Sequence, residues 1–517
     1  MAKALMIQGT GSGAGKSLLV AALCRIFRDE GKAVAPFKAQ NMALNSYITA
    51  EGGEIGRAQA LQAEAARIAP TVDMNPILLK ASGEIGSQVI IHGKVHATMR
   101  AREYYAFKKE AWESVKKSYS RLSREHELII IEGAGSPAEI NLMDVDVVNM
   151  SVAKHTRAPV VLVGDIDKGG VFASLYGTVK LLGRDSRHIK AFLINKFRGD
   201  LAILQPGLDM IRDKTGTPVI GVLPYIHNIG LPEEDGMALA RKSGVGNQKT
   251  GATVVKIVVI KLRFISNFTD FDPFVYEPDV ALIYSTNPAD IEHADLVIIP
   301  GSKNTVKDLL FLREHGIDES IRRAHAKGVQ VMGMCGGYQM LGRRLLDPHG
   351  VESPYKKIDG LGLLNIETLF EKRKTTCQVE AEINGPMFDS PIHPFIDSPS
   401  LTLKGYEIHM GESTGDIGLF KLKRRGNSTD SPIHRFIDTY VLDGSRNGNC
   451  WGTYIHGIFD NDTFRRCVVD GIRIKKGLPP LGSTCSYAGM KDRAIDNLAA
   501  VVREHIDMEF VKRIIGL

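Results

Sequence analysis

Residues 6–19, MIQGTGSGAGKSLL, place a glycine-rich turn before Gly15-Lys16-Ser17. A turn of this kind between a strand and a helix offers backbone N–H groups and the positive end of the helix dipole to phosphates. Lys16 would contact the β- and γ-phosphate oxygens, and the Ser17 hydroxyl would bind Mg²⁺. The pattern therefore predicts a site for ATP or another nucleoside triphosphate. The expected nucleotide-binding residues in this loop are Gly9, Thr10, Gly11, Gly13, Gly15, Lys16 and Ser17.

A second stretch, VMGMCGGYQMLG at 331–342, could carry a nucleophile. Cys335 stands on a glycine turn after an apolar strand and before a helix, an arrangement that exposes a thiol and favours its thiolate. The N–H of Gly336 would help to bind an oxyanion. The glycine loop IIPGSKNT at 298–305 could supply a second N–H, from Gly301 or Ser302.

The best candidate for the base that pairs with Cys335 is His456, at the end of a short strand in WGTYIHGIFDN. The G-x-C-x-G-x-Q pattern around Cys335 resembles the nucleophile signature of class I glutamine amidotransferases, which implies glutamine hydrolysis. In most of those enzymes a glutamate follows the histidine by two residues, but Ile458 stands here. The third member of the triad therefore stays open. His409, in GYEIHMG, is the alternative base.

The spacing of the phosphate loop narrows the class of ATP user. The usual pattern is G-x-x-x-x-G-K-[ST], but Thr10 occupies the first glycine position and Gly9 comes one residue early. This spacing resembles the loop of dethiobiotin synthetase and its relatives, ligases that use ATP to phosphorylate a carboxylate or carbamate. The signature lysine of partition and septum-site ATPases would fall at Gly11, which argues against a nucleotide switch.

Carboxylates follow two predicted strands near this loop. Glu132 follows IIIEG, and Asp165 and Asp167 lie in DIDKGG. Carboxylates at the carboxyl edge of a parallel sheet can reach a nucleotide-bound Mg²⁺. We expect Ser17, Glu132 and Asp165 to be the metal ligands.

Other polar residues at strand ends are candidates for binding the remaining ligands. Asn195, in INKFRGD, resembles the asparagine that reads adenine in dethiobiotin synthetase. Lys38, Gln40 and Asn41 follow the strand in PFKAQNMALNS, and Lys168 follows Asp167. We expect these last four residues to bind the carboxylate substrate, because ligands bind at the carboxyl edge of parallel sheets.

The elements that must position these residues are those of an α/β protein with two domains. Buried apolar runs alternate with longer segments up to about residue 230, which predicts a mostly parallel sheet with helices on both faces. The pattern restarts after a polar, glycine-rich stretch. We expect an ATP-dependent domain at 1–240, a linker at 241–252, a class I amidotransferase-like α/β domain at 253–460 with an insertion around 371–445, and a helical segment at 461–517 that packs on the second domain.

Composition excludes several other classes. The chain of 517 residues has a formal net charge of +6 without a basic tract, which gives no indication of nucleic-acid binding. Its six cysteines show no C-x-x-C spacing, so neither a zinc site nor a disulfide framework is indicated. No apolar run reaches the length of a membrane span, and no signal peptide is recognisable. We expect a cytoplasmic protein with small-molecule partners and no membrane partner; the oligomeric state stays open.

The order of the two domains and the missing glutamate resemble the cobyrinic and cobyric acid amidating enzymes of cobalamin biosynthesis. FKAQNMALNS, EGAGSPAEINL, DIDKGGVFASLYGT and PGSKNT look like the branch that produces cobyric acid. The resemblance implies glutamine- and ATP-dependent amidation, through an acyl phosphate, of the b, d, e and g carboxylates of adenosylcobyrinic acid a,c-diamide. The alternatives are a cobyrinic acid a,c-diamide synthase, a related cell-wall amidotransferase, or a nucleotide-switch binding protein.

Overall fold

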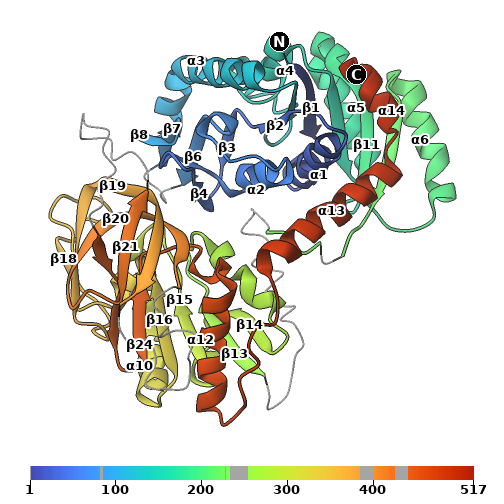
Figure 1. Cartoon of the computed structure of the whole chain (residues 1–517). Helices are drawn as coiled ribbons and strands as arrows, with labels where there is room; N and C mark the ends of the chain where they lie inside the picture. The colour runs from blue at the N-terminus through green and yellow to red at the C-terminus, as the bar shows by residue number, and fades with distance from the viewer. Residues whose placement is uncertain (1, 82–85, 228, 233–253, 385–400, 426–439) are drawn as a thin grey trace.

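The computed structural model describes residues 2–81, 86–227, 229–232, 254–384, 401–425 and 440–517 (Figure 1). The first domain is built on six parallel strands in the order β12-β11-β10-β1-β9-β2. These strands are apolar along most of their length because helices cover both faces of the sheet. Their bounds are β1 Lys3–Gly9, β2 Val34–Phe37, β9 Leu128–Glu132, β10 Val160–Asp165, β11 Ile189–Phe197 and β12 Val219–Pro224.

Alternate side chains of this sheet enter two separate cores. Leu5 and Ile7 of β1 pack with α1 (Lys16–Asp29), whereas Ala4 and Met6 enter the core on the opposite face. That second core is covered by α3 (Ala101–Glu125), α4 (Met150–Thr156), α5 (Val171–Leu182) and α6 (Leu201–Thr215). The predicted parallel sheet with helices on both faces is confirmed.

Smaller elements of the first domain lie between β2 and α3. Four short strands form a second sheet in the order β3-β6-β7-β8, and β4 pairs with β5. The helix α2 (Arg57–Ala65) follows β5 directly. The strands are β3 Gln40–Met42, β4 Ser46–Ile48, β5 Glu54–Gly56, β6 Ile77–Ala81, β7 Ser87–Ile91 and β8 Lys94–Met99.

The second domain has its own six-stranded sheet, in the order β14-β13-β15-β16-β24-β23. All neighbours are parallel except β23, which is antiparallel to β24. The strands are β13 Val255–Ile260, β14 Val280–Ser285, β15 Leu296–Ile299, β16 Gln330–Met334, β23 Ser445–Asn447 and β24 Cys450–Thr453. The helical elements are η5 Phe268–Tyr276, α8 Pro288–Glu292, α9 Thr305–Glu314, α10 Ile317–Ala326, α11 Gly336–Leu341, η6 Ile458–Asp460 and α12 Asp462–Lys475.

A further sheet is inserted between α11 and β23. Its strands follow the order β18-β17-β19-β21-β22, with β20 also paired to β19. They are β17 Arg344–Leu346, β18 Lys357–Asp359, β19 Ile366–Ile383, β20 Leu403–Gly415, β21 Phe420–Arg425 and β22 Val441–Asp443. The insertion thus begins before residue 371, because β17 and β18 already belong to this sheet. Residues 385–400 and 426–439 of it, and the predicted linker at 241–252, lie outside the described residues.

The C-terminal segment is shared between the domains, which corrects the prediction that all of residues 461–517 pack on the second. Only α12 joins the second core, through Phe464, Val468 and Ile472 among others. The helices α13 (Tyr487–His505) and α14 (Met508–Ile515) pack on the first sheet, beside α1 (Figure 1). An amphipathic pattern predicts which face of a helix is buried but not which domain covers it.

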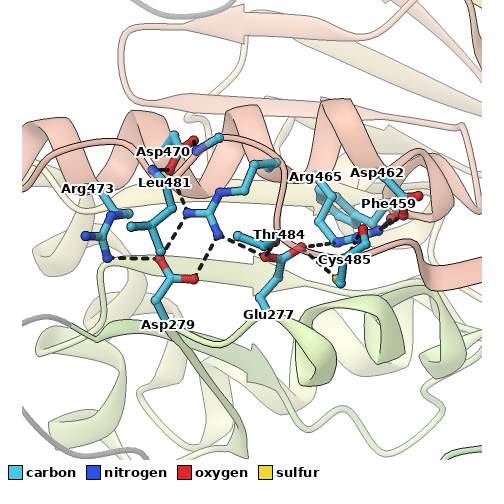
Figure 2. Close-up of polar contacts among 12 residues, drawn as sticks. Glu277, Asp279, Phe459, Asp462, Arg465, Asp470, Arg473, Leu481, Thr484 and Cys485 are labelled. Atoms are coloured by element: carbon cyan, nitrogen blue, oxygen red, sulfur yellow. Dashed lines mark hydrogen bonds and ion pairs between the residues drawn. The ribbon is translucent and has the colours of Figure 1, made fainter. Parts of the chain in front are cut away.

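A buried ionic network fixes the chain where it leaves α12 (Figure 2). The Glu277 carboxylate accepts hydrogen bonds from Arg465 Nε at 2.7 Å and Arg466 Nη1 at 2.9 Å. Asp470 accepts from the backbone N–H groups of Leu481 at 2.9 Å and Gly482 at 3.0 Å. The segment that leads from the second domain to α13 is therefore held at a defined place.

Within the described ranges, no helix combines the length and the apolar character that crossing a membrane would require.

Candidate functional site

The phosphate loop connects β1 to α1, and its backbone conformation requires glycine at only some of its glycine positions. Gly13 and Gly15 have φ of +72° and +95°, in the left-handed region that favours glycine. A Cβ on Gly15 would also overlap the Asn195 amide. Gly11 has open space around it, with no atom within 4 Å of a built Cβ. The backbone conformation therefore requires glycine at 13 and 15 but not at 11.

The side chains at the start of α1 meet Glu132 at the end of β9. Lys16 Nζ donates to the carbonyl oxygens of Gly11 at 2.9 Å and Gly135 at 3.1 Å. Ser17 Oγ donates to Glu132 Oε1 at 2.8 Å. Strand β9 lies next to β1, so the hydroxyl and the carboxylate converge at the carboxyl edge of the sheet.

Glu132 is buried but charged. Burial alone would raise the pKa of its carboxyl group. The Lys38 ammonium, 2.8 Å away, and the hydrogen bonds from Lys38, Gln62 and Ser17 outweigh burial and hold the pKa below its usual range.

The oxygen donors at this place fit Mg²⁺. Magnesium is usually held by one or two protein oxygens together with water and substrate phosphates. Ser17 Oγ and Glu132 supply such a pair beside the phosphate loop. Across the described residues there is no cluster of three or more His, Cys, Asp or Glu side chains that could hold a metal without a ligand's help.

Asp165, the other predicted metal ligand, lies elsewhere on the same edge. Its strand β10 is separated from β9 by β1. Its carboxylate accepts from Lys196 Nζ at 2.7 Å, and the same ammonium donates to the Gly13 carbonyl at 2.6 Å. Asp165 thus braces the phosphate loop through Lys196, and its contact with a metal stays a prediction.

Asn195 and Lys168 also contact the phosphate loop. Asn195 Nδ2 donates to the Ala14 carbonyl at 2.8 Å, and Lys168 Nζ donates to the Ser12 carbonyl at 3.0 Å. Both side chains therefore lie against the backbone of the phosphate loop. Adenine recognition by Asn195 and substrate binding by Lys168 stay predictions.

The predicted substrate residues after β2 divide between two surroundings. Lys38 pairs with Glu132, and Asn41 Nδ2 donates to Gln59 Oε1 at 3.0 Å. Gln40 Oε1 instead accepts a hydrogen bond from the Tyr104 hydroxyl. Lys38 thus contacts Glu132 and Asn41 contacts Gln59, whereas Gln40 contacts the long helix α3.

The second site is centred on Cys335, which has φ of +51° between β16 and α11. A non-glycine residue in this conformation is strained, which is typical of a nucleophile held on a sharp turn. The turn is tight because a Cβ on Gly337 would overlap the carbonyl oxygen of Ile299. A Cβ on Gly336 would lie 2.9 Å from the backbone nitrogen of Ser302. The predicted oxyanion loops at 301–302 and at 336 therefore meet beside Cys335.

His456 has the carboxylate partner that the sequence left open. Its Nδ1 lies 2.6 Å from Asp270 Oδ2, and Asp270 Oδ1 accepts from the Gly457 N–H at 3.0 Å. The Nε2 atom is buried without a hydrogen-bond partner in the described part of the chain, and Cys335 lies beside the ring. Burial would lower the pKa of His456, but the Asp270 carboxylate, aided by Cys335, raises it to about 10.

Sequence reasoning missed Asp270. It belongs to η5, and 186 positions separate it from His456. Its neighbourhood, SNFTDFDPF, carries no catalytic spacing. The one sequence signal for a carboxylate elsewhere in the chain was Ile458. Because this apolar residue occupies the position of the usual glutamate, another carboxylate has to orient the histidine.

The alternative base, His409, occupies different surroundings. Its ring stacks on Tyr454 with a centroid distance of 3.9 Å, and its Nδ1 lies 2.7 Å from the Gly411 carbonyl. Glu407, 3.5 Å from Nε2, is also paired with Arg424. The geometry therefore favours His456 as the base.

Family models match both domains. Residues 5–239 match the CobQ/CobB/MinD/ParA nucleotide binding domain, and residues 256–464 match the CobB/CobQ-like glutamine amidotransferase domain. These matches cover the phosphate loop and Glu132 in the first domain, and Cys335, Asp270 and His456 in the second.

Curated relatives extend the likeness over the full chain. A cobyric acid synthase of Thermodesulfovibrio yellowstonii is 49% identical, with 100% of both chains covered. One from Syntrophobacter fumaroxidans is 46% identical, covering 100% of this chain and 99% of that one. One from a Thermoanaerobacter species is 48% identical over 99% of each chain.

Proposed function

This chain belongs to the family of cobyric acid synthases, which are ATP-dependent glutamine amidotransferase ligases, and from this premise we propose which residues perform each half of the reaction. The full-length relatives described above are named as cobyric acid synthases and not as nucleotide switches. The observation that carries the proposal is the buried contact of Asp270 with His456 beside Cys335.

The second domain would release ammonia from glutamine. The Cys335 sulfur attacks the side-chain amide carbon, and the oxyanion that forms is stabilised by backbone N–H groups at Gly336 and in the Gly301 loop. The imidazolium of His456 gives its proton to the departing nitrogen, so ammonia leaves and a thioester remains. Water, deprotonated by His456, then hydrolyses the thioester to glutamate and restores the thiol. Asp270 orients the ring and stabilises its charged form throughout.

The first domain would activate the acceptor. Lys16 and the loop backbone would hold the ATP phosphates while a substrate carboxylate oxygen attacks the γ-phosphorus and ADP leaves. Ammonia then adds to the carbonyl of the acyl phosphate and displaces inorganic phosphate, which forms the amide. Mg²⁺ held by Ser17 and Glu132 would neutralise phosphate charge.

The acceptor we propose is a corrinoid polycarboxylate, adenosylcobyrinic acid a,c-diamide, amidated at its b, d, e and g carboxylates. Support comes from the names of the full-length relatives and from the mild positive charge of the chain. Gln40, Asn41, Lys38 and Lys168 remain our candidates for binding it.

Two variants, each assayed with glutamine and with ammonia as the nitrogen source, test which domain performs which half of the reaction. Cys335→Ala is expected to abolish glutamine-driven amide formation and to leave ammonia-driven formation near the wild-type rate. Lys16→Ala is expected to abolish both, because it removes the ammonium group at the phosphate loop. Products formed from the a,c-diamide with ATP and Mg²⁺ are identified by mass spectrometry, which also separates this acceptor from those of the diamide synthases.

Cys467→Ala, a substitution of another buried cysteine, is the matched control and should leave both activities intact. Full glutamine-driven activity in Cys335→Ala would refute the assignment of the glutaminase site.

A further inference from the structure

Two asparagines meet where the first domain contacts the second. Asn45 precedes β4 in the first domain, Asn267 precedes η5 in the second, and both side chains are buried. Asn45 Oδ1 accepts from the backbone N–H of Phe268 at 3.1 Å. Asn267 Oδ1 accepts from the backbone N–H of Ser46 at 2.9 Å. Each domain therefore uses a side chain to fix the backbone of the other.

The segment fixed in this way carries Asp270. Asn267 has φ of +52°, and its carbonyl accepts the backbone N–H of Asp270 at 3.0 Å. The left-handed residue and this hydrogen bond form the turn that opens η5. Asn45 thus acts on the backbone within one turn of the carboxylate that contacts His456.

A second contact joins the same part of the first domain to the other side of the imidazole. The Tyr406 hydroxyl donates to the Ser46 carbonyl at 3.1 Å. The Tyr406 ring stacks on His456, with centroids 5.3 Å apart and an interplanar angle of 17°. The backbones of Tyr406 and His456 also exchange hydrogen bonds of 3.0 and 2.8 Å. Tyr406 and the turn that carries Asp270 are therefore both bound to residues 45–46.

Residues 45–46 are in turn anchored to the phosphate site. The Asn45 carbonyl accepts from the backbone N–H of Arg57, the first residue of α2. That helix carries Gln62, whose amide donates to Glu132 Oε2 at 2.6 Å. The connection runs through backbone and helix, which are stiff elements.

We propose that Asn45, a residue of the ATP-dependent domain, is a positioning residue for glutamine hydrolysis, because it holds the turn that sets Asp270 against His456. The inference rests on the roles proposed above for Cys335, His456 and Asp270. It implies that the glutaminase site is complete only while the two domains are docked.

The pH dependence of glutamine hydrolysis reports this positioning. The titratable groups that face the His456 ring are Asp270, Cys335 and Tyr406, with Arg57 and Asp460 beyond Tyr406. If Asp270 moves away from Nδ1, the attraction that keeps the imidazolium protonated weakens. The proton is then lost at lower pH, so the alkaline limb of the rate profile shifts to lower pH.

The experiment measures glutamate release and ammonia-driven amidation by the full-length chain across pH. Asn45→Ala is expected to lower kcat for glutamine hydrolysis by about 10- to 100-fold, the range seen when groups that orient a catalytic ligand are removed. KM for glutamine should stay within about twofold, since Asn45 acts on the backbone of Phe268 and not on the turn that carries Cys335. The alkaline limb should move to lower pH, and ammonia-driven amidation should persist.

Asn267→Gly keeps the left-handed turn but removes the acceptor for Ser46, together with an amide that lies 3.4 Å from His456 Nδ1. It should shift the profile in the same direction. Gln378→Ala is the matched control, because Gln378 donates across the same domain boundary to the Ile48 carbonyl, which lies outside residues 45–46 and the turn at 267–270. It should leave the profile unchanged.

A wild-type pH profile in Asn45→Ala would overturn the inference, and so would an equal loss of activity in Gln378→Ala. If Asn45→Ala does not fold, an unchanged profile in Asn267→Gly would overturn it instead. Cys335→Ala is assayed in parallel. Its loss of glutamine hydrolysis alongside an unaffected Asn45→Ala would refute the positioning role alone, whereas its continued activity would refute the proposed function.

Discussion

The raised pKa of His456, about 10, favours its charged form in a place where little water can stabilise the charge. Its side chain and that of Asp270 are only 1% and 4% exposed. Two buried charges in contact stabilise each other strongly, but the loss of either leaves the other without compensation. The protonation state that amide cleavage needs therefore depends mainly on one carboxylate, that of Asp270.

We expect Asp270→Asn to reduce glutamine hydrolysis by at least about 100-fold, since an amide keeps the shape of the carboxylate but not its charge. The sign of the pH effect follows from the raised pKa of His456, about 10. In the wild type the imidazolium persists until the pH approaches that value, and in the variant it is lost closer to the ordinary pKa of about 6.5. The alkaline limb of kcat should therefore move to lower pH, with ammonia-driven amidation unaffected. A profile that keeps its alkaline limb would show that Asp270 does not control His456.

At the scale of elements, both sites are turns between a parallel strand and a helix. β1 leads into α1 through the phosphate loop, and β16 leads into α11 through Cys335. Each turn was predictable because its residues are contiguous and their spacing is dictated by local backbone geometry. Asp270 was not predictable, since its relation to His456 exists only after β13, η5 and β24 have assembled. The contact of Asn195 with the Ala14 carbonyl and that of Asp165 with Lys196 were hidden for the same reason.

The loop glycines offer a matched pair of substitutions. Gly15→Ala should lower the free energy of unfolding of the first domain by about 1–3 kcal/mol, because alanine is strained at φ of +95° and its methyl would meet Asn195. Gly11→Ala should change it by no more than about 0.5 kcal/mol, because nothing lies within 4 Å of the added atom. Urea unfolding without nucleotide measures both. Equal losses would contradict the loop conformation described above.

At the scale of the molecule, the two domains contact each other at several places, among them residues 45–46 and the helix α13. On α1, Arg25 is fully buried and donates to Asp492 at 2.6 Å, to Asp496, and to the Ala65 carbonyl at 2.8 Å. The sequence indicated a helical C-terminal segment and placed α12 on the correct domain, but it assigned α13 and α14 to the wrong one. The apolar stripe of α13 carries no information about which surface it meets, and the ion pairs that decide this involve residues far apart in sequence.

We expect the double substitution Asp492→Asn and Asp496→Asn to destabilise the first domain by about 1–3 kcal/mol, because it leaves a buried guanidinium without an anionic partner. The aspartates are about half exposed, which keeps the loss below that of a fully buried pair. Asp209→Asn with Asp213→Asn is the matched control. Those residues flank Arg212, which is 51% exposed, so their loss should cost no more than about 0.5 kcal/mol. Denaturant unfolding followed by tryptophan and far-UV signals compares the two, and similar losses would argue against a structural role for α13 on α1.

The position of α13 and α14 also fixes an order of events during synthesis. Leu498, Val502, Val511 and Ile515 complete the same core as Leu5, Ile7 and α1, although the entire second domain lies between them in the chain. The N-terminal half therefore emerges from the ribosome while one apolar face of its sheet is still incompletely covered. This face stays incomplete until α13 and α14 have been translated. The first domain can therefore complete its fold only after the second domain has been synthesised. A nascent chain stalled before residue 487 would contain every element of the amidotransferase-like core, but its ATP-binding domain would lack the helices α13 and α14.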